Sequence, residues 1–237
     1  MNIIITGASK GIGKAVATAF AATGAKLFLC ARNMQDLNQT VAGIQEKYPD
    51  VVIHAKQVDL ADRDAAKGFA AWCLSFGVPD ILVNNAGLYQ PGHIYDEHEG
   101  SLEIMMGINL YGAYYLTRAL LPAMMDQSNT TERGRHIFNI CSIASLNAYP
   151  NGGGYSISKF AMLGFSKNLR EELKPHRIRV TAVSPGAVLT NSWGDFDNSK
   201  QRIMEAEDVA RMILAASQLS PQAVVEDIVM RPILGDL

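Results

Sequence analysis

The stretch NIIITGASKGIGKAVATAFAAT, residues 2–23, decides the fold class of this chain. Residues 2–6 are a β-branched, largely apolar run ending at Gly7, which predicts a buried strand. Ile12, Val16 and Phe20 then recur at helical spacing, so an amphipathic helix follows the glycine turn. Such a turn lets backbone approach a pyrophosphate, and the helix N-terminus presents unpaired N–H groups. We therefore expect a dinucleotide phosphate site over residues 7–13. The spacing is G-x-x-x-G-x-G, and a plain tight turn is the alternative.

Strands alternate with helices along the rest of the chain. Further strands are predicted at residues 26–31, 51–58, 81–83, 136–140, 178–183 and 224–230, and a long helix is predicted over about residues 101–125. No linker or repeat interrupts the 237 residues. The pattern predicts a single α/β domain over residues 1–237, with a Rossmann-type, doubly wound parallel sheet and helices on both faces. Right-handed crossovers would bring the carboxyl ends of the strands, and the motifs after them, to one edge.

Composition and charge exclude several classes of function. A net charge of −2 and a pI near 6.2 predict no nucleic-acid binding, and no apolar stretch is long enough to span a membrane. The apolar start reaches glycine too early for a signal peptide, so a cytoplasmic protein is expected. No histidine or cysteine spacing matches a metal site, and we expect no metal. The cysteines, expected to be reduced thiols, are Cys30, Cys73 and Cys141.

Tyr155 and Lys159 stand four residues apart, and therefore on one face of a predicted helix. A free phenol has a pKa of about 10, and an ammonium beside it favours the phenolate and lowers that pKa. The pair suits general acid–base chemistry near neutral pH. An exposed helix face is the alternative, because this spacing is common by itself. Ser142 ends the preceding strand and adds a hydroxyl at the same predicted edge of the sheet.

The end of the second strand bears on the choice of cofactor. A fold of this kind that prefers NAD usually carries an acid there to bind the ribose 2′-hydroxyl, but residues 30–33 read CARN. Arg32, with Lys10 from the glycine loop, can instead hold a 2′-phosphate. Asp36 is the nearest acid, and it falls inside the next predicted helix. Solvated surface charges are the alternative, but the balance favours NADP(H).

Three further polar motifs follow predicted strands or interrupt a helix. Asp59 is able to accept a hydrogen bond from an adenine amino group, or to cap the helix that starts near Asp62; both readings stay open. Residues 84–87, NNAG, suit close approach of a ligand to the backbone, with a turn as the alternative. Asn109 lies in the middle of an apolar helix and needs a partner, which a packing hydrogen bond would supply.

These motifs together resemble the short-chain dehydrogenase/reductase family. The matching positions, in the order of the family and over nearly the whole chain, are residues 6–13, Asp59, residues 84–87, Asn109, Ser142, Tyr155 with Lys159, and residues 185–186 with Thr190. The resemblance implies a seven-stranded Rossmann sheet and hydride transfer between a nicotinamide ring and a carbonyl or alcohol carbon. Lys10 and Arg32 match the NADP-preferring members. Cys141 departs from the second serine that many members have beside the catalytic one.

The resemblance also implies roles for single residues. Tyr155 would be the general acid/base, and Lys159 would bind the nicotinamide ribose and lower the tyrosine pKa. Ser142 would hold the substrate oxygen, and Asn109 would anchor a water in a proton relay. The expected cofactor-binding residues are Gly7, Ser9, Lys10, Gly11, Ile12, Gly13, Arg32, Asn33, Asp59, Leu60, Asn85, Ala86, Gly87, Tyr155, Lys159, Pro185, Gly186, Val188 and Thr190.

The expected activity is therefore NADPH-dependent reduction of a small carbonyl compound to an alcohol. A non-catalytic NADP(H) sensor or scaffold is the alternative, because fold does not imply function. Residues 191–204 are expected to form a short substrate lid, and the tail more weakly resembles bacterial sepiapterin-reductase-like members, which makes a pterin carbonyl one candidate substrate. The expected pocket-lining residues are Leu88, Tyr89, Ile143, Leu146, Tyr149 and Trp193.

A homodimer or homotetramer is also expected. The predicted helices that carry Asn109 and Tyr155 have more apolar surface than one sheet face covers, and family members commonly associate through these helices. The alternative is that all these side chains face the sheet. The side chains in question are Tyr111, Tyr114, Phe160, Met162 and Phe165.

Overall fold

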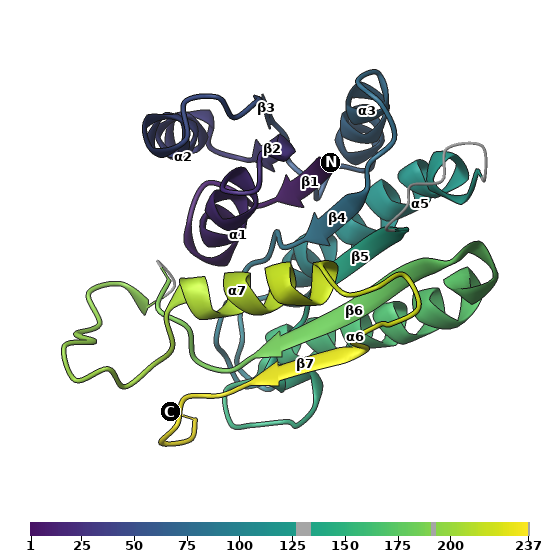
Figure 1. The fold of residues 1–237 in the computed structure, drawn as a ribbon. Coiled ribbons are helices and arrows are strands. Elements are labelled where there is room, and N and C mark those ends of the chain that lie inside the picture. Colours follow the sequence, from purple (N-terminus) through teal and green to yellow (C-terminus); the bar gives the residue numbers. More distant parts are fainter. Residues whose placement is uncertain (127–133, 191–192, 237) are drawn as a thin grey trace.

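The computed structural model describes residues 1–126, 134–190 and 193–236. Within these residues, seven strands form one parallel sheet in the order β3-β2-β1-β4-β5-β6-β7 (Figure 1), and the predicted fold class is confirmed. The edge strands β3 and β7 are shorter than predicted. The strands are β1 (Asn2–Thr6), β2 (Lys26–Ala31), β3 (Ile53–Gln57), β4 (Ile81–Asn84), β5 (Arg135–Ile140), β6 (Ile178–Pro185) and β7 (Asp227–Met230).

Helices cover both faces of the sheet (Figure 1). One face carries α1 (Gly11–Ala21), α2 (Met34–Lys47) and α7 (Ala206–Ser217). The other carries α3 (Arg63–Leu74), α5 (Gly112–Met125) and α6 (Gly153–Leu173). In β1, Ile3 and Ile5 pack into the core under α1 and α7, whereas Ile4 packs into the opposite core. A central parallel strand is buried on both faces, which explains why β1 reads as a continuous apolar run.

The strand order reverses between β1 and β4, which are neighbours in the sheet although two strands separate them in the chain. The connections after these two strands therefore leave in opposite directions and open a crevice at the carboxyl edge. The glycine loop follows β1 and the segment NNAG follows β4, so both lie at this crevice.

The long helix predicted over residues 101–125 is confirmed, but it is not α-helical throughout. The chain forms α4 (Ser101–Met106), a π-helical turn at Gly107–Tyr111, and then α5. Single π-helical turns inside α-helices occur frequently at functional sites, and this one carries Asn109. The helix also presses against the loop after β3, because a Cβ atom at Gly112 would lie 2.7 Å from the carbonyl oxygen of Leu60.

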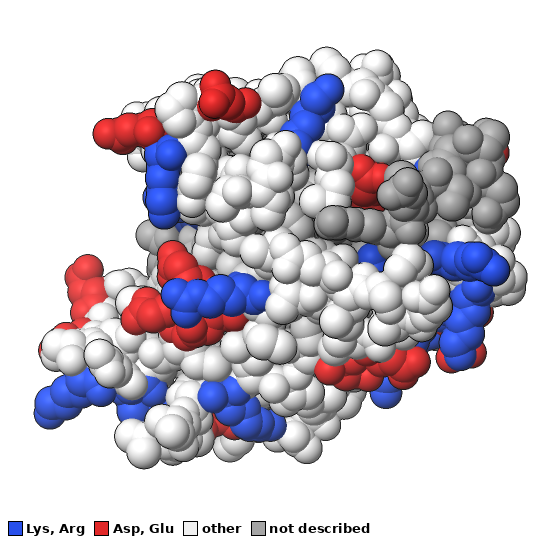
Figure 2. Space-filling model, in the orientation of Figure 1, with Lys and Arg blue, Asp and Glu red and all other residues white. Residues whose placement is uncertain are grey.

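Part of the apolar surface on α5 and α6 is exposed. Tyr111, Tyr114 and Phe160 expose 45%, 38% and 45% of their surface, as the expectation of a second subunit requires. Met162 is buried, so it is not available to a second subunit and that prediction is wrong, whereas Phe165 is partly buried. Acidic and basic side chains are interspersed on the face shown in Figure 2. No helix in the described ranges is long and apolar enough to cross a membrane.

Candidate active site

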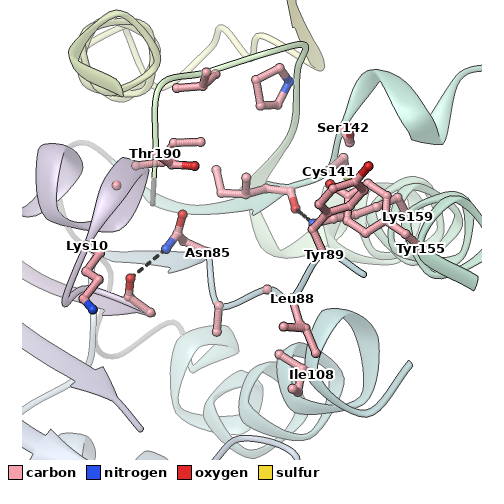
Figure 3. Close-up of a pocket in the computed structure, with 18 of the residues that line it drawn as sticks. Lys10, Asn85, Leu88, Tyr89, Ile108, Cys141, Ser142, Tyr155, Lys159 and Thr190 are labelled. Atoms are coloured by element: carbon pink, nitrogen blue, oxygen red, sulfur yellow. Dashed lines mark hydrogen bonds between the residues drawn. The ribbon is translucent and has the colours of Figure 1, made fainter. Parts of the chain in front are cut away.

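A cavity of about 1300 Å³ runs along the carboxyl edge of the sheet (Figure 3). Lys10 and Thr190 lie at one end, and Ser142, Tyr155 and Lys159 lie at the other. The remaining predicted cofactor residues that line it are Gly7, Ser9, Gly11, Ile12, Arg32, Asn33, Asp59, Leu60, Asn85, Ala86, Gly87, Pro185, Gly186 and Val188. Three predicted site or pocket residues, Gly13, Asn109 and Leu146, do not line it.

Gly7 and Gly13 shape the glycine loop at one end of the cavity by close backbone approach. Gly7 has a φ of 63°, and a Cβ atom there would lie 2.8 Å from Cα of Ala86. A Cβ atom at Gly13 would lie 2.3 Å from the carbonyl oxygen of Gly7. Gly13 therefore packs against the backbone of the glycine loop and does not line the cavity itself. The helix α1 begins at Gly11, and the Lys10 side chain before it makes no capping hydrogen bond, so the first turn suits an anion.

Asn85 joins the loop after β4 to the glycine loop. Its Nδ2 atom donates to the carbonyl oxygens of Thr6 at 2.9 Å and Gly7 at 3.1 Å. In return, Oγ1 of Thr6 accepts the backbone N–H groups of Asn85 and Ala86, both at 2.9 Å. The Asn85 side chain thus holds the two walls of the crevice together, which requires no ligand.

The corner of the cavity beside β2 contains two cations and one acid. Arg32 is exposed, and no ion pair joins it to a carboxylate in the described part of the chain. Lys10 instead forms an ion pair with Asp36, with Nζ and Oδ2 2.8 Å apart. Asn33 caps α2 by accepting the backbone N–H of Asp36 at 3.1 Å. Asp36 lines the cavity, and the sequence prediction did not include it among the site residues.

The two readings of Asp59 are separated by the structure. Asp62 caps α3, because its Oδ1 atom accepts the N–H groups of Asp64 at 2.7 Å and Ala65 at 2.9 Å. Asp59 accepts the N–H of Ala61 at 3.0 Å and lines the cavity beside Leu60. The helix-capping reading is therefore wrong for Asp59, and its carboxylate stays at the cavity wall.

The opposite end of the cavity brings together a serine, a tyrosine and a lysine. Ser142 follows β5, and α6 carries the other two residues in its first turns. Burial raises the pKa of the Tyr155 phenol, and a hydrogen-bonding contact with the Ser142 hydroxyl partly opposes this. Burial also lowers the pKa of Lys159. Its ammonium donates to the carbonyl oxygen of Ile140 at 2.9 Å and lies 5.8 Å from the centre of the Tyr155 ring.

The expected lowering of the tyrosine pKa by Lys159 is therefore not found in this structure. The net direction for Tyr155 is upward, because removal of the phenolate from water outweighs the favourable contacts. At neutral pH the phenol holds its proton.

Asn109 joins the π-helical turn to two other segments. Its Oδ1 atom accepts the N–H of Leu88 at 2.7 Å, and its Nδ2 atom donates to the Leu88 carbonyl at 3.0 Å. Nδ2 also donates to Oγ of Ser158 at 2.8 Å, and that hydroxyl donates to the carbonyl oxygen of Tyr155. The Asn109 side chain thus makes the packing hydrogen bonds of the alternative, and the Ser158 hydroxyl connects it to the backbone of Tyr155.

Three of the five predicted pocket residues that line the cavity are aromatic. The predicted residues that line it are Leu88, Tyr89, Ile143, Tyr149 and Trp193. The Tyr89 ring packs edge-on against the Tyr155 ring, with centroids 4.8 Å apart. Residues 191–192 of the predicted lid lie outside the described residues. The segment from 193 to 204 returns to the end of β6, where Met204 pairs with Val188.

The C-terminal tail also reaches the cavity. Arg231 and Asp236 both line it, and their side chains form an ion pair. Arg202, from the predicted lid, donates to the carbonyl oxygens of Gly235 at 2.9 Å and Asp236 at 3.0 Å. The long-range contacts of Arg202 had no local sequence signal, although the tail residues belong to the segment that resembles sepiapterin-reductase-like proteins.

Proteins of known sequence align with most of the length of this chain. Sepiapterin reductase of Chlorobaculum tepidum is 32% identical, over 99% of this chain and 97% of its own length. Dehydrogenase/reductase SDR family member 7B of Mus musculus is 38% identical, over 90% of this chain and 69% of its own length.

Solved structures with the same fold include cofactor complexes. An alcohol dehydrogenase from the archaeon Thermococcus sibiricus, complexed with 5-hydroxy-NADP, has a TM-score of 0.88 and 26% identity, over 98% of this chain and 96% of its own. L-Sorbose reductase from Gluconobacter frateurii, complexed with NADPH and L-sorbose, has a TM-score of 0.86 and 25% identity, over 98% of this chain and 95% of its own. A sequence model described as short chain dehydrogenase matches residues 1–201. The chain therefore belongs to the short-chain dehydrogenase/reductase family of oxidoreductases.

Proposed function

We propose that this protein is an NADPH-dependent reductase that converts a ketone or aldehyde to an alcohol. The observation that carries the proposal is the shared cavity, with the glycine loop at one end and the Ser142, Tyr155 and Lys159 side chains at the other. A non-catalytic sensor of the same cofactor needs the first end only. The presence of all three chemical groups at the second end favours the enzyme.

The residues present fit a dinucleotide phosphate. The close approach of backbone at Gly7 and Gly13 forms a loop that a Cβ atom at either position would obstruct. The first turn of α1 offers backbone N–H groups to the pyrophosphate, and Lys10 and Arg32 offer cations to a 2′-phosphate. The cavity exceeds the roughly 300–1000 Å³ of ordinary ligand pockets, which suits a cofactor together with a substrate.

When bound, NADPH supplies the hydride, and the chain's own residues handle the substrate oxygen and the proton. The hydroxyls of Ser142 and Tyr155 would hold the carbonyl oxygen. Since the pKa of Tyr155 is raised by burial, its phenol is protonated at neutral pH and suits the role of proton donor in the reductive direction. The Lys159 ammonium, fixed by the Ile140 carbonyl near the ring, would stabilise the phenolate that remains after the proton has left.

Substitution of Tyr155 by phenylalanine tests this proposal. We expect turnover with a reducible carbonyl compound to fall by about 10² to 10⁴-fold, because a positioned general acid contributes roughly that much. The dissociation constant of NADPH, measured by fluorescence titration without substrate, should stay within about threefold. Tyr48→Phe removes a phenol that does not line the cavity and is the matched control. Unchanged turnover in Tyr155→Phe would refute the assignment.

The substrate class follows from the aromatic lining. Tyr89, Tyr149 and Trp193 suit a flat or hydrophobic carbonyl compound. Similarity to the Chlorobaculum tepidum sepiapterin reductase supports a pterin carbonyl as one choice. A panel of sepiapterin, a quinone and a keto ester, followed by the absorbance of the reduced cofactor, would rank these classes. No consumption of NADPH with any carbonyl compound would instead favour the sensor.

We also infer that the protein is a homodimer or homotetramer. The exposed Tyr111, Tyr114 and Phe160 side chains on α5 and α6 support this, because they leave a partly aromatic surface uncovered. Light scattering after size-exclusion chromatography gives the mass, and a monomer at micromolar concentration would contradict the inference.

A further inference from the structure

A loop between β4 and α4, residues 88–100, is fastened to the start of α6. Oε2 of Glu97 accepts the backbone N–H of Gly154 at 3.0 Å. The N–H of Gly92 donates to the carbonyl oxygen of Asn151 at 3.1 Å. Both contacts reach the residues at which the helix carrying Tyr155 begins, although Glu97 and Gly154 are 57 positions apart in the chain.

Three glycines make this contact sterically possible. A Cβ atom at Gly153 would lie 2.4 Å from the carbonyl oxygen of Gly92 and 2.6 Å from Oε2 of Glu97. A Cβ atom at Gly92 would lie 2.8 Å from Cβ of Glu97, and one at Gly154 would lie 3.2 Å from Cα of Leu102. The glycines at 153 and 154 of the run GGG therefore let the loop and α4 approach the helix closely.

Glu97 also supplies the hydrogen-bond acceptor that the N-terminus of α6 lacks. Gly152, the N-cap of α6, has no side chain with which to accept the N–H groups of the first turn. A carboxylate at a helix N-terminus satisfies one of these donors and interacts favourably with the positive end of the helix dipole. Glu97 is thus an N-terminal cap delivered from a distant part of the chain.

The same loop touches the tyrosine in two ways. Tyr155 directly follows Gly154, the residue that Glu97 holds, and its ring packs against that of Tyr89. Between these two points the backbone bond from Gly92 to Asn151 also holds the loop, whereas Ile94 and Tyr95 expose 73% and 83% of their surface. Tyr89 and Tyr155 line the cavity, whereas Glu97 does not. Any influence of Glu97 on chemistry must therefore pass through the loop or the helix start.

We propose that Glu97 is a positioning residue, which holds the loop 88–100 on the first turn of α6 and thereby keeps the Tyr155 phenol in its reactive place. The inference rests on the proposed role of Tyr155 as proton donor. Loss of the carboxylate leaves the loop held to the start of α6 by the backbone bond from Gly92 to Asn151 without its side-chain tether, and small displacements of a reacting group lower rates steeply. Lys10 lies at the other end of the cavity, and NADPH binding there should not respond.

The experiment compares Glu97→Ala, Glu97→Gln and Glu99→Ala in the full chain. Glutamine retains an oxygen acceptor for Gly154, and Glu99 is an exposed acid of the same loop with no hydrogen bond or ion pair recorded among the described residues. We expect kcat for a carbonyl substrate to fall about tenfold in Glu97→Ala, and to stay within about threefold of the parent in Glu97→Gln and Glu99→Ala. The Kd of NADPH should stay within about twofold in all three variants.

Two results would overturn the inference. One is an unchanged kcat in Glu97→Ala, and the other is an equal loss in Glu97→Ala and Glu97→Gln. If Glu97→Ala does not fold, Glu97→Asp, whose carboxylate is one methylene short of Gly154, takes its place with the same thresholds. Tyr155→Phe separates this inference from the function itself, because an inactive Tyr155→Phe together with a fully active Glu97→Ala refutes the positioning role alone.

Discussion

Replacement of Asp36 by asparagine should make the protein bind NADPH more tightly without changing its affinity for NADH. In the structure, Asp36 holds Lys10 in an ion pair of 2.8 Å at the corner of the cavity that also contains Arg32. A 2′-phosphate that uses Lys10 must compete with this carboxylate. Asparagine is nearly the same size, and it releases the ammonium and removes a negative charge beside the phosphate.

The size of the effect follows from the exposure of the pair. The Lys10 and Asp36 side chains are 49% and 24% exposed, so their attraction is that of a partly solvated ion pair. Such pairs contribute about 0.2–1 kcal/mol, which corresponds to a factor of about 1.4 to 5 in affinity. We therefore expect the Kd of NADPH to fall by a factor of about 1.4 to 5 in Asp36→Asn. NADH has no 2′-phosphate and should show no comparable change.

The assay is a fluorescence titration of NADPH and NADH in the absence of substrate, at low and at high salt. Salt should shrink the gain, because it screens partly exposed charges. Asp50→Asn removes the same charge from an exposed position outside the cavity and is the control. The reasoning is refuted if NADPH binds no more tightly to Asp36→Asn, if NADH gains equally, or if Asp50→Asn produces the same gain.

Three other predictions concern the phosphate site and the core. Arg32→Ala should raise the Kd of NADPH about tenfold or more but leave that of NADH within twofold, since a hydrogen bond to a charged group contributes about 1.5–3 kcal/mol; equal effects would contradict the phosphate contact. Gly13→Ala places a Cβ atom 2.3 Å from the Gly7 carbonyl and should lower the Tm and weaken NADPH binding, whereas Gly43→Ala, with open space in α2, should not. Burial, followed by the nearby positive charge of Arg179, holds the pKa of His136 well below that of an unfolded histidine, which is about 6.5. Below pH 6.5 the unfolded chain therefore binds more protons than the folded chain, and the free energy of unfolding falls by up to about 1.4 kcal/mol per pH unit. In urea unfolding, the free energy of unfolding lost between pH 7 and pH 5 should be smaller for His136→Gln than for the exposed control His98→Gln. Equal losses in the two variants would contradict the role of His136.

Local sequence patterns were sufficient for the fold class and for most of the cavity lining. The apolar run of β1 predicts a strand buried on both faces, and the glycines after it predict a close backbone turn, because both properties depend on neighbours in the chain. Parallel topology then brings the end of every strand to one edge, so the sequence by itself predicts Tyr155, Ser142 and Lys10 at a common site.

Contacts between distant segments were decided by the tertiary structure alone. The pattern around Asn109 is helical, yet a π-helical turn forms there and its amide binds the backbone of Leu88. Asp36 appears as an ordinary residue of α2, and only the fold places Lys10 beside it. No local sequence pattern around Glu97 predicts that its carboxylate caps α6. The physical reason is that periodicity reports which face of an element is buried, whereas a hydrogen bond or an ion pair depends on the ångström-scale separation of groups that the packed chain alone determines.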